Sequence, residues 1–407
     1  MNILRKTFSI LIGILLLGIT LFILQLFYRP SFQKVGKCHL NKDLIEQLAY
    51  LEEELHGGAG RDMQALFPEG FVFLNALYGL TWIELAQHLE ETDELYAHAH
   101  QEIAWVVQEL NSEQARSTFD EDMPLPYGIF YRGWSNYVLG KKLMIEQPAD
   151  RDSAELTRFH QNCQEIKEAM SQHSSPFLSS YRGASWPADM FVGMASISLH
   201  AELFDDSYEQ DIHEWLSRVQ SSVDTFGLIP HQTDPMSGEV LESARGSSQS
   251  LILNFLHEID SGYAYQQFEI YKNLFLSRRL GMPGIREYPQ GRSGGGDIDS
   301  GPVIWGIGGA ASIVGQRTMA LYGESAIAIG LRNSIETFGA GRSKKGKKRY
   351  LYGMLTMADA FIAWSNSTEA YKEDRLQSRT FWQIRTFLYA LPLLLIGGIA
   401  AVRLWRK

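Results

Sequence analysis

Two aspartates in a glycine-rich stretch are the residues of this chain best placed for acid–base chemistry. Asp297 and Asp299 follow three consecutive glycines at 294–296 and precede an apolar segment. Glycine adopts backbone conformations closed to other residues and lets the chain approach a ligand closely. Ser300 is a favourable helix N-cap and Pro302 a favourable first-turn residue, so the stretch predicts a tight loop that delivers both carboxylates to a helix N-terminus. The alternative is that these aspartates only cap the helix.

Other acidic and basic side chains stand at the entrances of apolar segments. Glycoside hydrolysis needs one protonated and one ionised carboxyl group across a sugar, whereas a lyase or epimerase needs a base and a cation that holds the substrate carboxylate. We predict Asp297, Asp299 and Asp189 as the catalytic carboxylates. Glu69, at the first entrance, is a predicted substrate contact. His231, in a loop between helices, is predicted as a base or donor, although a lone loop histidine is more often neither.

A short pattern, Arg-Gly-X-Ser, recurs near the start of three apolar segments. Its arginines are Arg132, Arg182 and Arg245. Parallel helices would gather their partly positive N-termini at one mouth, where arginine forks suit carboxylate, phosphate or sulfate. We predict these arginines as substrate clamps. The alternative is that they pair with nearby carboxylates such as Glu242 and hold the helices together.

Aromatic residues crowd the same entrances. Rings suit the apolar faces of sugars or an isoprenoid chain, although most aromatic residues of a helical protein lie in its core. The aromatic side chains predicted to contact substrate are those of Tyr131, Trp134, Trp186 and Tyr288.

Residues 38–366 form a succession of helical patterns with little strand-like alternation. Apolar segments begin near residues 67, 127, 187, 247, 302 and 352, and a more polar, amphipathic segment separates each from the next. Similar units at an interval of about 50–60 residues indicate a repeat architecture. An apolar inner set and an amphipathic outer set fit a closed double ring, although an open superhelix would have the same helix pairing.

Six such hairpins resemble the (α/α)6 toroid, the fold shared by six-hairpin glycosidases, several polysaccharide lyases, sugar epimerases and linalool dehydratase-isomerase. The resemblance covers about residues 40–366 and is one of architecture alone. It implies an all-α fold, an (α/α)6 toroid of six helical hairpins, flanked here by one N-terminal and one C-terminal transmembrane helix.

Both ends of the chain are apolar enough to span a membrane. An uncleaved signal anchor is predicted because no small-residue cleavage site follows the first apolar run. The charges of the short tails favour both termini inside and the large domain outside the cytoplasm. The predicted divisions are a tail at 1–7, a transmembrane helix at 8–28, the toroid at 38–366, a linker at 367–385, a transmembrane helix at 386–402 and a tail at 403–407.

Composition excludes several other classes of protein. The net charge of −10 argues against a general nucleic-acid binder, and the basic run 342–349 is predicted to be a solvated loop, with contact to acidic lipid as the alternative. A nucleophile elbow, a zinc-protease helix and a phosphate-binding loop are absent from the sequence. Neither a cofactor nor a metal is predicted. The two cysteines, Cys38 and Cys163, could form a disulfide outside the cytoplasm, although two thiols far apart in sequence are more often simply buried.

The combined pattern predicts a membrane-anchored, extracytoplasmic enzyme that acts on a neutral or acidic carbohydrate as a glycoside hydrolase, lyase or epimerase. Its partners would be that substrate or another small molecule and the lipid bilayer. One alternative is a lyase or isomerase of isoprenoid alcohols, which the resemblance to linalool dehydratase-isomerase implies. The other is a non-catalytic glycan-binding or scaffold subunit of an envelope assembly, with protein partners there.

Overall fold

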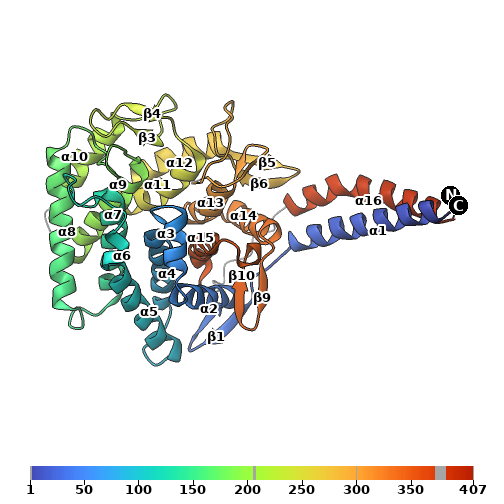
Figure 1. Ribbon diagram of the computed structural model, residues 1–407, viewed down its shortest axis with the longest axis horizontal. Coiled ribbons are helices and arrows are strands. Elements are labelled where there is room, and N and C mark those ends of the chain that lie inside the picture. Colours follow the sequence, from blue (N-terminus) through green and yellow to red (C-terminus); the bar gives the residue numbers. More distant parts are fainter. Residues whose placement is uncertain (1, 205–207, 299, 372–381, 407) are drawn as a thin grey trace.

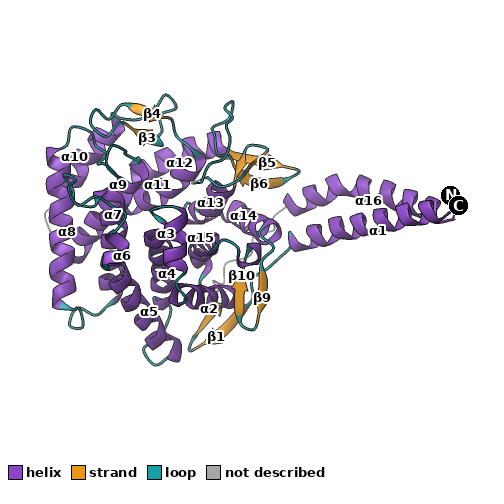
Figure 2. Cartoon of the chain, in the orientation of Figure 1, coloured by secondary structure: helices purple, strands orange, loops and turns teal. Residues whose placement is uncertain are grey.

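The computed structural model describes residues 2–204, 208–298, 300–371 and 382–406, which are mostly helical (Figure 2). The helices form a rounded body from which two long terminal helices project together (Figure 1). The predicted predominance of helix is confirmed. Of the predicted linker, residues 372–381 lie outside the described residues, and so does Asp299.

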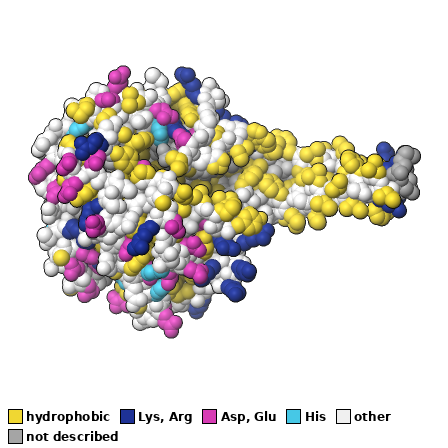
Figure 3. Space-filling model, in the orientation of Figure 1, with side chains coloured by type: hydrophobic (Ala, Val, Ile, Leu, Met, Phe, Trp, Pro, Cys, Tyr) yellow, Lys and Arg dark blue, Asp and Glu magenta, His cyan; other side chains and the backbone are white. Residues whose placement is uncertain are grey.

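The projecting helices are α1 (Asn2–Gln25) and α16 (Trp382–Arg406), which lie side by side with both chain ends at the far tip (Figure 1). Ser9 Oγ donates a 2.8 Å hydrogen bond to the Ala401 carbonyl oxygen. Both helices are long and apolar enough to cross a membrane, and apolar side chains cover the pair (Figure 3). Helix α16 extends beyond both ends of the predicted span 386–402, whereas α1 begins before the predicted span 8–28 and ends at Gln25, short of its predicted end.

Six apolar helices contact one another in chain order, and the last contacts the first, which closes a ring. A closed ring rather than an open superhelix brings residues far apart in sequence to one face. These inner helices are α4 (Gly70–Ala86), α7 (Gly128–Ile145), α9 (Pro187–Phe204), α11 (Gly246–Ile259), α13 (Gly309–Leu321) and α15 (Thr356–Asn366).

An amphipathic helix packs against each inner helix from outside. In α8 the buried residues Phe159, Cys163, Ile166 and Met170 recur at helical spacing, so one stripe faces the ring and the rest faces solvent. The outer helices are α2 (Lys42–His56), α5 (Glu94–Leu110), α8 (Ser153–Gln172), α10 (Glu209–Gln220), α12 (Ser261–Phe275) and α14 (Ser325–Phe338).

Neighbouring inner helices run in the same direction. Asn254 Nδ2 donates to Thr318 Oγ1 at 3.0 Å, and one turn earlier Ser250 Oγ donates to the Ala311 carbonyl oxygen at 3.2 Å. These bonds advance in the same sense along α11 and α13. The N-termini of these two helices therefore open on the same face, as predicted for the inner set.

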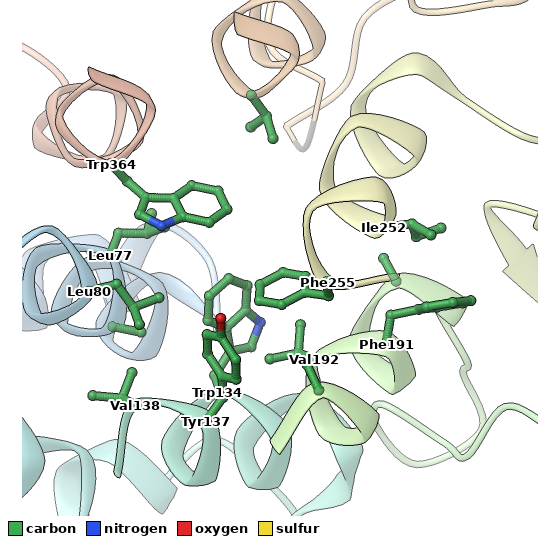
Figure 4. Close-up of a cluster of buried hydrophobic side chains, with 14 of the residues drawn as sticks. Leu77, Leu80, Trp134, Tyr137, Val138, Phe191, Val192, Ile252, Phe255 and Trp364 are labelled. Atoms are coloured by element: carbon green, nitrogen blue, oxygen red, sulfur yellow. The ribbon is translucent and has the colours of Figure 1, made fainter. Parts of the chain in front are cut away.

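Aromatic side chains fill the ring at the level drawn in Figure 4. Trp134 and Phe255 meet edge to face with centroids 5.4 Å apart, and Phe255 stacks on Trp364 at 6.2 Å. All three are almost completely buried. Trp134, a predicted substrate contact, therefore belongs to the core, as large apolar rings usually do.

An arginine whose side chain is only 13% exposed links three inner helices. Arg317 of α13 makes two bonds to the Glu84 carboxylate of α4, at 2.5 and 2.9 Å, and donates to the Trp364 carbonyl oxygen of α15 at 3.0 Å. The two parallel bonds match the planar guanidinium to the carboxylate. This contact reaches across α15 and reinforces the point at which the ring closes.

A buried lysine holds the base of the terminal pair against the ring. Lys348 Nζ lies 3.0 Å from Asp43 of α2 and 2.6 Å from Glu336 of α14. Tyr28, just beyond α1, donates a hydrogen bond to the same Asp43 carboxylate. This network connects the end of α1 to two outer helices.

Short antiparallel hairpins and small helices occupy the connections. The basic run 342–349, predicted to be a loop, is one of these hairpins. In the described residues Cys38 and Cys163 form no disulfide. The strands are β1 (Phe32–Val35), β2 (Cys38–Asn41), β3 (Gln232–Thr233), β4 (Val240–Glu242), β5 (Leu276–Arg279), β6 (Met282–Ile285), β7 (Val303–Ile304), β8 (Ile307–Gly308), β9 (Arg342–Lys344) and β10 (Lys347–Arg349), and the small helices are α3 (Ala59–Leu66), α6 (Glu113–Arg116), η1 (Leu351–Gly353) and η2 (Ser367–Glu369).

The segment after the glycine-rich stretch differs from its prediction. The helix begins at Gly309, because the β7–β8 hairpin intervenes, and its tight turn places Trp305 at a positive φ of 52°. Ser300 and Pro302 are therefore not at the helix start. The loop still contacts the start of α13, since the Ala310 N–H donates to the Ser300 carbonyl oxygen at 3.1 Å.

Candidate active site around Arg245

A buried arginine at the start of α11 organises the largest group of acidic side chains near the predicted site. Arg245 is the N-cap residue of α11 and only 3% exposed. Its Nε donates to Glu287 Oε1 at 2.8 Å, and its Nη1 donates to Asp297 Oδ2 at 2.6 Å. A buried guanidinium needs such partners, because an uncompensated buried charge is strongly destabilising. We call His231, Glu242, Arg245, Glu287, Tyr288 and Asp297 the Arg245 cluster.

Glu287 forms the floor of this cluster, two residues beyond β6. It is fully buried, and its Oε1 also accepts a 2.7 Å hydrogen bond from Ser247 Oγ. The backbone joins the same elements, since the Gly246 N–H donates to the Glu287 carbonyl oxygen at 2.8 Å. Burial raises the pKa of Glu287, against the opposing effects of Ser247 and Arg245. Glu287 therefore fixes the guanidinium but is closed to solvent.

The glycine-rich loop carries Asp297 to the exposed side of the guanidinium. Asp297 and Ser300 bond reciprocally: the Ser300 N–H donates to Asp297 Oδ1 and the Asp297 N–H to Ser300 Oγ, each at 2.9 Å. Burial alone would raise the pKa of Asp297, but the bonds from Arg245 and Ser300 outweigh it and hold that pKa well below its usual range. Asp297 is thus an ionised carboxylate, and its side chain is 45% exposed.

The glycines of this loop make room for Tyr288. A Cβ added to Gly294 would lie 2.4 Å from Tyr288 Cζ, so a larger residue there would displace the ring. Tyr288 OH donates to the Gly295 carbonyl oxygen at 3.0 Å. The same ring lies 5.4 Å from the Arg245 guanidinium carbon, within cation–π distance. Tyr288 therefore supports both the loop and the arginine.

Glu242 approaches the cluster from β4. Its Oε1 lies 3.7 Å from Arg245 Nη1, the nitrogen that also binds Asp297, and its side chain is 39% exposed. Burial and the neighbouring Asp297 charge raise the pKa of Glu242, although Arg245 opposes them. The two exposed carboxyl groups at one nitrogen thus have pKa values displaced in opposite directions.

His231 completes the buried side of the cluster. Burial and then the Arg245 charge lower the pKa of His231 to about 3, so the imidazole is neutral near pH 7. Its Nε2 faces Arg245 Nη1 at 3.5 Å, and its Nδ1 lies 3.1 Å from Ser248 Oγ. Ser248 Oγ in turn donates to the Arg245 carbonyl oxygen at 3.2 Å. These contacts are consistent with a proton on Nδ1, so that Nε2 can accept a hydrogen bond from Arg245. His231 therefore helps to hold the guanidinium in place.

Asp189 lies in the first turn of α9 and is buried. Its Oδ2 accepts a 2.6 Å hydrogen bond from Ser180 Oγ, which itself accepts the Trp186 N–H at 3.1 Å. These bonds fold the chain before α9 back onto the helix start. The contacts of Asp189 described here are thus with its own entrance loop, whereas Asp297 reaches the Arg245 cluster.

The three Arg-Gly-X-Ser arginines do not occupy matching positions. Arg132 lies inside α7 and pairs with Glu165 of α8, between an inner and an outer helix. Arg182 lies in the loop before α9, where it is exposed and contacts Asp120 at 2.9 Å. Arg245 alone is an N-cap. The motif falls at a different distance from each helix start, so its three copies in the sequence are not equivalent positions in the fold.

The remaining predicted contacts form an aromatic group near the starts of α4, α7 and α9. Tyr181 donates a hydrogen bond to the Glu69 carboxylate, and its ring meets Trp186 with centroids 5.2 Å apart. Tyr131 OH donates to the Leu110 carbonyl oxygen at 2.9 Å and is buried. Of the predicted set, the structure therefore brings together Arg245, Asp297, His231 and Tyr288.

Sequence reasoning missed Glu287 and gave Glu242 only a supporting place. Glu287 follows the short β6 strand, and no motif marks it in the sequence. The available signal was a single acidic residue in a mainly apolar stretch, which often indicates a buried ion pair. Its partner, 42 positions away, cannot be identified without the fold.

Comparisons with known proteins give one kind of match. Neither a family model nor a curated protein sequence matches the chain. Among solved structures, the chain is similar to a glycoside hydrolase of family 105 from C. acetobutylicum ATCC 824. The TM-score is 0.43 and the identity 11%, over 72% of this chain and 93% of that one.

Proposed function

We propose that this protein is a membrane-anchored glycoside hydrolase whose acid–base pair is Glu242 and Asp297. The observation that carries the proposal is the pair's arrangement at Arg245 Nη1. Asp297 lies 2.6 Å and Glu242 3.7 Å from that nitrogen, and their pKa values are displaced in opposite directions. Two neighbouring carboxyl groups with separated pKa values are the requirement for general-acid and general-base roles in one site.

In this mechanism the protonated Glu242 donates its proton to the glycosidic oxygen as the bond to the sugar breaks. The ionised Asp297 faces the developing positive charge on the sugar ring. It either accepts a proton from the attacking water, or attacks the ring to form a glycosyl ester, which water then hydrolyses while Glu242 accepts the proton of that water. Both side chains are partly exposed and so accessible to a substrate, whereas the Arg245–Glu287 pair beneath them is buried. Arg245 thus acts as a positioning residue that keeps Asp297 ionised.

The charge of the cluster favours hydrolysis over the lyase and epimerase alternatives. Those reactions use a cation to hold the substrate's carboxylate. Arg245 already faces Glu287 and Asp297, and these two carboxylates outnumber it even when Glu242 is protonated. A further anion would meet excess negative charge, so we propose a neutral sugar at the cleaved position.

The anchoring part of the proposal concerns α1 and α16. Each is long and apolar enough to span a membrane, and the pair projects from the body as one unit (Figure 1). Because both chain ends lie at the far tip, they would share one side of the bilayer. The tail charges favour the cytoplasmic side for the tips and the extracytoplasmic side for the ring.

A non-catalytic glycan-binding or scaffold subunit is the second candidate. The pairing of Arg245 with two carboxylates and the filled ring interior favour it, since both are features of a rigid structural body. In this case Glu242 and Asp297 would bind sugar hydroxyls without breaking a bond. The two candidates differ in whether turnover accompanies binding.

A test uses the full chain in detergent against neutral and acidic 4-nitrophenyl glycosides and oligosaccharides. Nitrophenol or new reducing ends would report hydrolysis, and ultraviolet absorbance of an unsaturated product would report a lyase. We expect hydrolysis of a neutral glycoside, lost by at least a hundredfold in Glu242→Gln and Asp297→Asn with unchanged thermal melts. Glu239→Gln, an exposed neighbour of Glu242, is the matched control. Glycan binding without turnover would favour the second candidate, and full activity in both variants would refute the assignment.

A further inference from the structure

Two outer helices face each other with histidines and glutamates at matching spacing, away from the Arg245 cluster. Helix α2 presents a glutamate and a histidine four residues apart, and α5 presents a histidine and a glutamate four residues apart. Side chains at this spacing lie on one face of a helix. We call the four residues, Glu52, His56, His98 and Glu102, the histidine–glutamate cluster.

The donor atoms of this cluster lie close together. His98 Nε2 is 3.0 Å from Glu52 Oε2, and His56 Nε2 is 3.0 Å from Glu102 Oε2. The ligand atoms of Glu52, His98 and Glu102 all lie within 4.8 Å of one another. Ligand atoms about 2.0–2.1 Å from a tetrahedral zinc ion would be separated by about 3.3 Å. Small side-chain movements would therefore create a coordination site.

The surroundings resemble the supporting shell of a metal site. Tyr78 OH of α4 donates a 2.8 Å hydrogen bond to Glu102 Oε2, which fixes that carboxylate. The ring of Trp82 meets His98 edge to face at 5.4 Å, and Trp105 lies against His56 at 4.2 Å. Such contacts orient ligands and lower the local dielectric, and both effects strengthen metal binding.

An ion also has a route to the cluster. The His56 side chain is 42% exposed, whereas that of Glu102 is only 10% exposed. The side chains of His98 and Glu52 are 38% and 33% exposed, so solvent reaches both directly. The cluster thus has one buried side and one side open to solvent.

We infer that the histidine–glutamate cluster binds a divalent transition-metal ion such as Zn²⁺. Imidazole and carboxylate ligands suit this class of ion, and its charge would balance the two carboxylates. The ion would join α2 and α5, neighbouring outer helices, and so stabilise the fold. The competing explanation is that two histidine–glutamate hydrogen bonds hold these helices without a metal.

The sharpest test is the absorption spectrum of Co²⁺ added to the full chain, purified in detergent and stripped with a chelator. Tetrahedral Co²⁺ absorbs strongly in the visible range, whereas Co²⁺ in water absorbs weakly. We expect an intense visible band that saturates at one ion per chain and disappears when Zn²⁺ is added. Zn²⁺ should also raise the melting temperature of the stripped protein.

Variants on the same helix separate this site from adventitious binding. His98→Gln and Glu102→Gln should each weaken Zn²⁺ binding at least tenfold and abolish the band. His100→Gln is the matched control, because His100 lies two residues away and packs against Tyr96 instead. A wild-type protein without the band, or a band that survives in His98→Gln, would overturn the inference. Neither result bears on the proposed hydrolase activity, which uses other residues.

Discussion

Asp297 accepts a 2.6 Å hydrogen bond from Arg245, which lies 52 positions earlier in the chain. The bond connects the glycine-rich loop to the N-cap residue of the inner helix α11. It also makes Asp297 a stronger acid, because the guanidinium stabilises the ionised carboxylate. Glu242 lies near the same nitrogen without so short a bond, and its pKa is raised.

Arg245→Lys should shift the acidic limb of the pH–rate profile to higher pH. A lysine cannot bond both Glu287 and Asp297 with the arginine's planar geometry, so the pKa of Asp297 would rise toward its ordinary value. The loss of one charge-assisted hydrogen bond costs about 1.5–3 kcal/mol. If the transition state loses this free energy, kcat/KM falls about tenfold to hundredfold. The pH dependence of kcat/KM measures both effects. Arg182→Lys, a change at an exposed arginine, serves as the control. If the acidic limb of the Arg245→Lys profile does not move, the positioning role of Arg245 is contradicted.

Gly294→Ala should lower activity much more than Gly295→Ala. A Cβ at Gly294 would overlap the Tyr288 ring, whereas a Cβ at Gly295 meets nothing within 4 Å. Displacement of Tyr288 would move the loop that carries Asp297, with an expected loss of at least tenfold in kcat/KM and a small change in the melt. The measurement is kcat/KM of both variants on the same glycoside. Equal rates would show that the loop's position does not control turnover.

Asp359→Asn should stabilise the protein at pH 8 but hardly at pH 4. Burial raises the pKa of Asp359 from 3.8 to about 7, so the folded state prefers the protonated acid. That preference stabilises the fold fully below pH 3.8 and is lost as pH rises to about 7. At pH 8 the ionised group destabilises the fold by about 2–4 kcal/mol, which asparagine would remove. The melting temperatures of Asp359→Asn and the wild type should diverge as pH rises from 4 to 8. Asp152→Asn, a change at an exposed residue, is the control. A constant difference across this range would refute the raised pKa of Asp359.

Arg317→Met should destabilise the ring by about 3 kcal/mol. The change leaves the Glu84 carboxylate without its bidentate partner between two inner helices. Lys347→Met removes a surface ion pair with Glu53 and should cost less than about 1 kcal/mol. Urea unfolding of the two variants compares the pairs directly. A similar small effect from both would mean that Arg317 does not reinforce the ring closure.

The helical content could be predicted from the sequence, whereas the connections could not. Apolar and amphipathic segments alternate along the sequence as inner and outer helices alternate in the fold, because a fully buried helix and a helix with one buried stripe, such as α8, differ in composition. The start of α13 was misplaced because Ser300 and Pro302 satisfy helix-start rules equally well in the turn before a hairpin. Local propensity cannot tell these apart without the contacts of the neighbouring chain.

The site was predictable only in part for a similar reason. Asp297 carries a local signal, the glycines before it, and was identified. Glu287 and the histidine–glutamate cluster depend on partners brought together by the ring; His98 and Glu52, for example, are 46 positions apart. The Arg-Gly-X-Ser motif indicated equivalent positions in three hairpins, but its three copies lie at different distances from their helix starts. The sequence shows which residues share one face of a helix. It does not show which residues of two different helices lie opposite each other.

The paired terminal helices have a mechanical consequence. A domain on one membrane helix can swivel about that helix, but a domain joined through two packed helices can turn only if the whole pair turns with it. The Tyr28–Asp43 contact at the base stiffens this joint further. With α1 and α16 in a bilayer, Asp297 would therefore keep a nearly constant height and tilt above the lipid. Such a protein would meet glycans at one fixed distance from the membrane rather than sweep a volume around it.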